Sequence, residues 1–260
     1  MGACHRSVLA VRKPTNQTRN AIMNAEELEI EQEKVDAEVK RIAEELNVEV
    51  VCDGVILPKH YLSTVIKTHK TLWVWREPHD SDGGYCYKKH IYLHRIEIRD
   101  TKRSVYLDPM RYLEYSLKNN LVWYADIPDA DKDVEVSKLL GQTAVINIKK
   151  SLGGAGVDWS TFWNHVDKFS HIVKRQLEIA KPKIIIATGT IGFFEKYGYL
   201  TNASIHKKTY RNYYVSDGRI ILDCYHPKAR IAQERFCDDI IMALRDAKER
   251  GFLNLQASPA

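Results

Sequence analysis

The sequence predicts an α/β fold with a central, largely parallel sheet flanked by helices on both faces and preceded by a helical extension. From about residue 70 onward, strand-like apolar segments alternate with segments of helical periodicity, as in parallel α/β domains. Residues 181–190, KPKIIIATGT, are too apolar for a strand with one face in water, so this strand should be central. We expect four parts: a basic flexible arm (1–23), a helical extension and linker (24–69), the α/β domain (70–250) and a tail (251–260).

The segment before residue 70 contains a predicted helix and a predicted strand. Asn24 and Glu27 have the spacing of a capping box, and apolar residues recur at helical spacing after them. This pattern predicts a helix over about 25–47. The following residues 48–57, VEVVCDGVIL, are strand-like.

The middle of the chain alternates strands with other segments. Residues 70–84 read as a short strand that breaks into a polar, glycine-bearing loop. Residues 85–107 are cationic and aromatic, and the part from Tyr85 to Arg103 is consistent with a surface that stacks a base or lines a DNA groove, or with a plain surface hairpin. Residues 110–125 have helical spacing, and 143–158 form a strand followed by a basic, glycine-rich loop.

The last third of the α/β domain has clear local signals. Asp158 should cap a helix with an apolar stripe from Phe162 to Val173. Residues 213–225 read as two strands about an Asp-Gly turn, and a final helix should cover about 230–249.

Composition limits the classes of function. The chain has 260 residues and a net charge of +5, which permits a polyanionic partner without requiring one. No run of apolar residues approaches the roughly 20 of a membrane span, so we expect no membrane partner. The cysteines form no CxxC pair, which argues against a zinc ribbon or a disulfide framework and favours a reduced, cytoplasmic protein. They are Cys4, Cys52, Cys86, Cys224 and Cys237.

Chemistry-bearing residues follow three of the predicted strands. Arg76-Glu77-Pro78-His79, Asn147-Ile148-Lys149-Lys150 and His226-Pro227-Lys228 each come directly after an apolar run. Functional groups of α/β sheets gather beyond the carboxyl ends of the strands. Taken singly, Glu77 reads as a surface carboxylate, Asn147 as a turn cap and His226 as a structural histidine.

The ordered set of these segments resembles the uracil-DNA glycosylase superfamily over about residues 70–249. WREPH stands at the family's first motif, AVIN at its middle strand, DWSTFWNHV at the helix after it, and HPKAR at its last motif, His-Pro-Ser-Pro with a wedge residue. The resemblance implies an enzyme that flips a nucleotide out of DNA and cleaves its N-glycosidic bond. The iron–sulfur branches of the family need clustered cysteines near the first motif, and the cysteines of this chain lack that spacing, so we expect neither a metal nor another cofactor. The chain would act as a monomer on duplex or single-stranded DNA.

The resemblance also implies a role for each candidate residue. Glu77 would be the catalytic acid that orients or deprotonates water, and His226 would support the leaving base. Asn147 would bind the edge of the base, and His79 would stand beside C5 of the pyrimidine. Four cations, Lys149, Lys150, Lys228 and Arg230, would contact DNA, with Arg230 in the wedge position.

Departures from the family pattern leave the base open. Trp75 replaces the first-motif glycine, His79 replaces a tyrosine that excludes 5-substituents, and Lys228 and Ala229 replace Ser and Pro. They favour a pocket that tolerates a substituent on the base, so the substrate is uracil or a modified pyrimidine. Two alternatives remain: a phage-defence glycosylase that excises hypermodified cytosine, and a non-catalytic nucleic-acid-binding module of the same fold.

Overall fold

A mixed sheet of seven strands forms the centre of the described structure, in the order β1-β3-β2-β4-β7-β6-β5. The computed structural model describes residues 23–63, 69–78, 86–97, 104–153, 157–227 and 230–255. The strands are β1 (Gly54–Val55), β2 (Thr71–Trp75), β3 (Thr143–Asn147), β4 (Ile184–Thr188), β5 (Ser204–His206), β6 (Tyr213–Ser216) and β7 (Arg219–Cys224).

The four central strands, β3, β2, β4 and β7, run parallel to one another, and the remaining strands join the sheet antiparallel. This arrangement confirms the α/β class and the largely parallel centre of the sheet. It also confirms the central place of residues 181–190, because β4 lies between β2 and β7 with all five residues buried. The Asp-Gly turn joins β6 to β7 as expected, with positive φ angles at Asp217 and Gly218.

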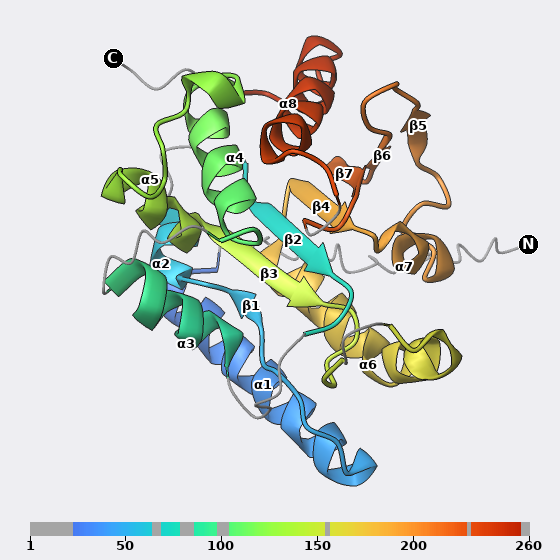
Figure 1. Cartoon of the computed structure of the whole chain (residues 1–260). Helices are drawn as coiled ribbons and strands as arrows, with labels where there is room; N and C mark the ends of the chain where they lie inside the picture. Colours follow the sequence, from blue (N-terminus) through green and yellow to red (C-terminus); the bar gives the residue numbers. More distant parts are fainter. Residues whose placement is uncertain are drawn as a thin grey trace, which may run out of the picture.

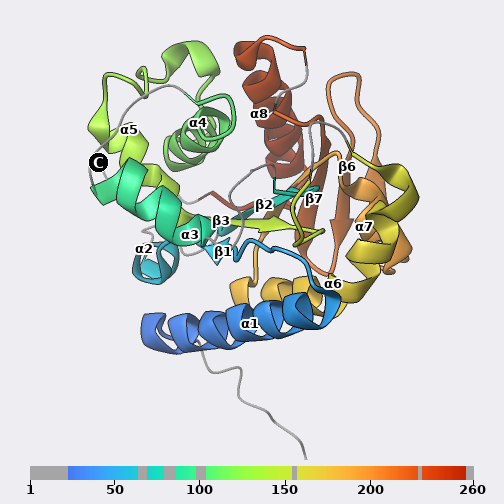
Figure 2. The same cartoon turned by 60° about the horizontal axis from the view of Figure 1, so that its bottom comes forward.

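Helices cover both faces of this sheet (Figure 1). One face carries α1 (Ala25–Leu46), α6 (Trp159–Ala180) and α7 (Ile191–Lys196), and the other carries α4 (Asp108–Lys118) and α8 (Gln233–Glu249). The shorter helices are α2 (Pro58–Ser63), α3 (Tyr87–Ile91), which continues into a π-helical turn (Tyr92–Glu97), and α5 (Val134–Lys138). In Figure 2 α1 and α6 lie next to each other beneath the sheet.

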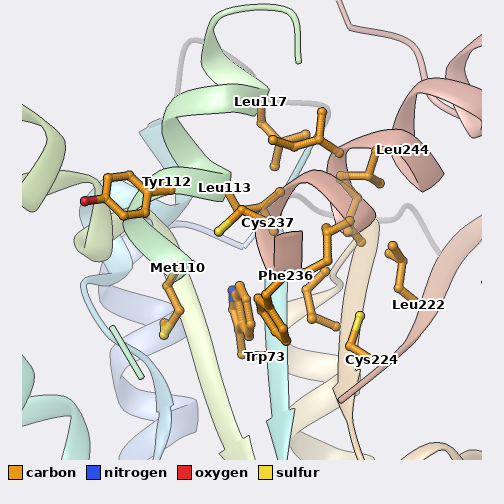
Figure 3. Packing of buried hydrophobic residues seen from close by; sticks show 14 of the residues in the cluster. Trp73, Met110, Tyr112, Leu113, Leu117, Leu222, Cys224, Phe236, Cys237 and Leu244 are labelled. Carbon is orange, nitrogen blue, oxygen red and sulfur yellow. The ribbon is translucent and has the colours of Figure 1, made fainter. Parts of the chain in front are cut away.

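Strand alternation divides the core into two layers. Leu72 and Val74 of β2 pack with α1 and α6, while Trp73 and Trp75 pack with α4 and α8. Figure 3 shows the second layer, in which Trp73 lies beside Phe236 of α8. Because side chains of a strand point alternately to opposite faces, a strand covered on both sides must be apolar throughout.

The predicted extension contributes to the same sheet and core. The helix expected over 25–47 is α1, and both hydrogen bonds of its capping box are present between Asn24 and Glu27. Leu28, Val35 and Val39 of α1 are buried in one cluster with the apolar face of α6. In addition, β1 pairs antiparallel with β3. Residues 24–69 therefore supply both a helix and a strand to the α/β layers.

Several predicted boundaries differ from the structure. The strand expected over 48–57 is reduced to β1 and isolated bridges. The helix expected over 110–125 ends at Lys118, because Asn120 and Leu121 take positive φ angles of 60° and 65° that no helix contains. Within 85–103, the described residues 87–97 are helical, so the hairpin interpretation is wrong there.

One carboxyl group is buried between α4 and β2. The side chain of Glu114 accepts a hydrogen bond from the Thr71 hydroxyl, and Glu114 is 5% exposed. Burial raises the pKa of Glu114 from 4.5 to about 8, although the Thr71 hydrogen bond opposes the rise. Glu114 is therefore largely protonated at neutral pH.

None of the helices in the described part of the chain combines the length and the apolar character needed to cross a bilayer.

Candidate active site

The carboxyl ends of the four parallel strands meet at one edge of the sheet. β2 comes first along the chain and has β3 on one side and β4 on the other, so the direction of chain progression reverses beside it. Ligands of open α/β sheets bind at this kind of switch point. Glu77 follows β2, Asn147 ends β3, and His226 follows β7, so the fold brings all three predicted strand ends to this edge.

Glu77 lies against the loop that follows β3. Its Oε2 atom is 2.6 Å from Nζ of Lys149, and the two side chains are only 8% and 11% exposed. The backbones of the two loops are also joined, since Lys149 N–H donates to Arg76 O and Gly153 N–H donates to Pro78 O, both at 2.9 Å. The predicted acid and a predicted DNA-contacting lysine thus form one largely buried ion pair.

Gly153 makes room for this carboxyl group. A Cβ atom at position 153 would lie 2.3 Å from Cδ of Glu77, closer than non-bonded carbons approach. Lys149 Nζ donates a second hydrogen bond to Leu152 O at 3.1 Å, which fixes the ammonium on the same loop. The loop after β3 therefore positions Glu77 in two ways: the Gly153 backbone lies close to the carboxyl group, and the Lys149 ammonium pairs with it.

Asn147 is 1% exposed and is held by Asp53, which immediately precedes β1. Asp53 Oδ2 accepts hydrogen bonds from the backbone N–H of Asn147 at 2.7 Å and from its Nδ2 at 3.0 Å. A flipped amide would place Oδ1 against the Asp53 carboxylate, so the observed orientation is the favourable one. Oδ1 is buried and has no hydrogen-bond partner among the described residues. Buried polar atoms normally have a partner, so Oδ1 is an unsatisfied acceptor, and a ligand reaches it only if the side chains that cover it move.

Lys150 has a structural position that the sequence interpretation missed. Its side chain is fully buried, with Nζ 2.6 Å from Asp53 Oδ1 and 2.7 Å from Gln176 Oε1. Gln176 completes the group by donating to Asp53 Oδ1 at 2.8 Å. Burial lowers the pKa of Lys150, and the nearby Asp53 carboxylate opposes that change. With no exposed surface, Lys150 cannot contact a DNA phosphate in this conformation, and we withdraw that role.

An aromatic group surrounds the end of β2 on the α4/α8 face. The ring of Trp75 is 5.5 Å from that of Tyr87 and 6.0 Å from that of Tyr106. Tyr106 in turn meets the imidazole of His226 edge to face at 5.8 Å. Trp75 is also the register partner of Asn147, so the aromatic group and the amide belong to neighbouring positions of the sheet. The Trp75 indole Nε1 is buried and has no acceptor among the described residues.

His79 and Lys228 lie outside the described residues. Arg230 is exposed in the segment between β7 and α8.

Three residues of this region were not identified from the sequence: Asp53, Gln176 and Tyr106. An aspartate and glycine inside the otherwise apolar segment VEVVCDGVIL are the signal that could have marked Asp53. No local pattern marks Gln176, and Tyr106 is one of several aromatic residues in the stretch 85–107, where nothing distinguishes it from the others.

Comparison with known proteins adds no family assignment. No protein-family model matches the sequence, and a search of curated proteins finds no match.

Proposed function

We propose that this protein is a monofunctional DNA glycosylase that flips out uracil or a modified pyrimidine and hydrolyses its N-glycosidic bond. The observation that carries the proposal is the amide of Asn147 at the switch point of the sheet. Asp53 occupies its donor side, and its buried Oδ1 atom has no described partner. An acceptor fixed in this way suits the N–H donor on the pairing edge of a pyrimidine, such as the exocyclic amino group of cytosine or N3–H of uracil.

Two further groups supply what bond cleavage requires. Breaking the bond leaves positive charge on the sugar and negative charge on the base. Glu77, held by Lys149 at 2.6 Å, offers a carboxylate that stabilises the sugar cation and orients water. His226 offers an imidazole at the end of β7 that stabilises the departing base. Tyr87 and Tyr106, which are half-buried and pack against the buried Trp75, offer rings against which a flipped base can stack.

The test is single-turnover excision by the wild type and by Glu77→Gln, detected as alkaline cleavage at abasic sites. The substrates are single-stranded and duplex DNA that carry uracil, 5-hydroxymethyluracil, 5-substituted cytosines or glucosylated hydroxymethylcytosine. We expect Glu77→Gln to slow excision by roughly 10²-fold or more while DNA binding is retained. Glu178→Gln, at an exposed position on α6, is the matched control and should leave the rate unchanged.

The outcomes separate the candidate functions. Excision confined to glucosylated or otherwise hypermodified cytosine favours the defence enzyme. Binding without an abasic product from any substrate contradicts the glycosylase proposal and leaves a nucleic-acid-binding module. An equal rate for wild type and Glu77→Gln would show that Glu77 is not the catalytic carboxylate.

A further inference from the structure

A second feature near the carboxyl end of β7 is a cationic cleft of about 370 Å³. Its size falls within the roughly 300–1,000 Å³ typical of ligand sites. Three arginines and one carboxylate line it, together with two tyrosines. These residues are Arg211, Arg230, Arg235, Asp239, Tyr210 and Tyr225.

Arg211 is the buried cation of this cleft. It is 6% exposed, and its Nε and Nη2 atoms have no hydrogen-bond acceptor among the described residues. Its nearest carboxylate, Asp239, is 3.5 Å from Nη2, which is an ion pair but a poor hydrogen bond. A buried guanidinium with unsatisfied N–H groups is costly unless an anion completes it.

The first turn of α8 borders the same cleft. The N-cap residue, Ala232, has no side-chain cap, so the first N–H groups of this helix of 17 residues lack the usual side-chain acceptor. Arg235 lies in that first turn and is exposed. A helix N-terminus with free N–H groups and positive dipole is suited to a phosphate.

Tyr225 adds an aromatic surface. The guanidinium of Arg211 lies over its ring at 4.1 Å from the centroid, while the tyrosine as a whole remains 57% exposed. The exposed part of the ring is available to a sugar or base attached to the phosphate. His226, which is predicted to stabilise the leaving base, directly follows Tyr225 in the chain.

We infer that this cleft binds a phosphate group of the DNA strand next to the flipped nucleotide, through Arg211, Arg235 and the first turn of α8. The assignment of this phosphate to a DNA strand rests on the proposed function. The predicted DNA-binding residue Arg230 lines the same cleft and is therefore suited to contact the same strand. Asp239 offsets one of the three cations, so the cleft keeps a net positive charge.

The test measures binding of a fluorescein-labelled oligodeoxynucleotide with no excisable base, by anisotropy over a range of KCl concentrations. The variant Arg211→Gln/Arg235→Gln should lower the slope of log K against log salt by about 0.7 per lost contact for a single strand and about 0.9 for a duplex. Lys34→Gln/Arg41→Gln on α1, which removes the same charge from the opposite face of the sheet, should leave the slope unchanged.

The single variant Arg235→Gln keeps the test valid if the buried Arg211 proves necessary for folding. The Arg235 side chain is exposed, so its replacement should not disturb the core. This variant should lower the magnitude of the slope by the amount expected for one lost phosphate contact, about 0.7 for a single strand or about 0.9 for a duplex. A slope equal to that of the wild type for this variant and for a folded double variant overturns the inference.

Two parallel measurements separate the remaining possibilities. Inorganic phosphate and deoxycytidine monophosphate are titrated alone, and binding of either one without any change in the strand's slope overturns the assignment to DNA. The excision assay is run on the same proteins. A reduced slope without abasic product from any substrate supports the phosphate site and contradicts the glycosylase, whereas excision with an unchanged slope does the reverse.

Discussion

The buried carboxyl group of Glu114 predicts a stability that falls as the pH rises. In the unfolded chain this group releases its proton near its ordinary pKa of 4.5, whereas in the folded protein it holds the proton to about 8. Between these values the folded state binds more protons than the unfolded state. The stabilisation is therefore fully present below pH 4.5 and is lost progressively as the pH rises to about 8.

The magnitude follows from the two pKa values. Each unit of pKa difference corresponds to about 1.4 kcal/mol, so Glu114 should cost the wild type about 3 kcal/mol of unfolding free energy between pH 5 and pH 8. Glu114→Gln keeps the shape and can still accept the Thr71 hydrogen bond, but it has no proton to lose. Relative to wild type, the variant should therefore gain about 3 kcal/mol over the same interval.

Urea unfolding at pH 5, 6.5 and 8, followed by circular dichroism, measures this difference. The control, Glu178→Gln, changes an exposed carboxylate and should differ from wild type by a constant amount at all three pH values. If Glu114→Gln also differs from wild type by a constant amount, then Glu114 is ionised in the folded protein and the burial argument is refuted.

Three further predictions concern the candidate site. Lys150→Met leaves Asp53 buried without its cation and should cost about 3–5 kcal/mol in urea unfolding, so a loss below about 1 kcal/mol would contradict the buried ion pair. Gly153→Ala should displace the Glu77 carboxylate and slow single-turnover excision without loss of folding. The control Gly192→Ala, whose new methyl group meets Trp163 at an ordinary 3.8 Å, should leave the rate unchanged. Equal excision rates for the two variants would show that the position of Glu77 does not affect catalysis. His226→Ala should slow excision by roughly 10²-fold if the imidazole stabilises the leaving base, and a wild-type rate in the folded variant would limit His226 to packing against Tyr106.

Local patterns predicted much of the fold. The capping box of Asn24, the N-cap at Asp158 and the turn at Asp217-Gly218 each depend on residues a few positions apart, and all three are present. The central place of β4 was also predictable, because a strand covered on both faces is apolar at every position.

The candidate site was predictable only in part, because its contacts join distant parts of the chain. Asp53 and Asn147 are separated by 94 positions, and no periodicity connects them. Lys149 and Lys150 look equivalent in the sequence, yet one pairs with Glu77 and the other with Asp53. From the sequence alone, two lysines after a strand predict a basic loop, because the distant carboxylates that pair with them cannot be identified.

The position of Asp53 bears on where the protein can be shortened. The family resemblance begins near residue 70, and a chain cut there would keep Glu77, Asn147 and His226 in sequence. It would also lose the carboxylate that accepts two hydrogen bonds from Asn147 and pairs with Lys150, along with the strand that pairs with β3. The Asn147 amide would then be free to rotate, and the Lys150 ammonium would be left buried without its partner. The smallest unit with an intact candidate site therefore includes the segment that carries Asp53, and truncation near residue 70 would remove part of the site's support.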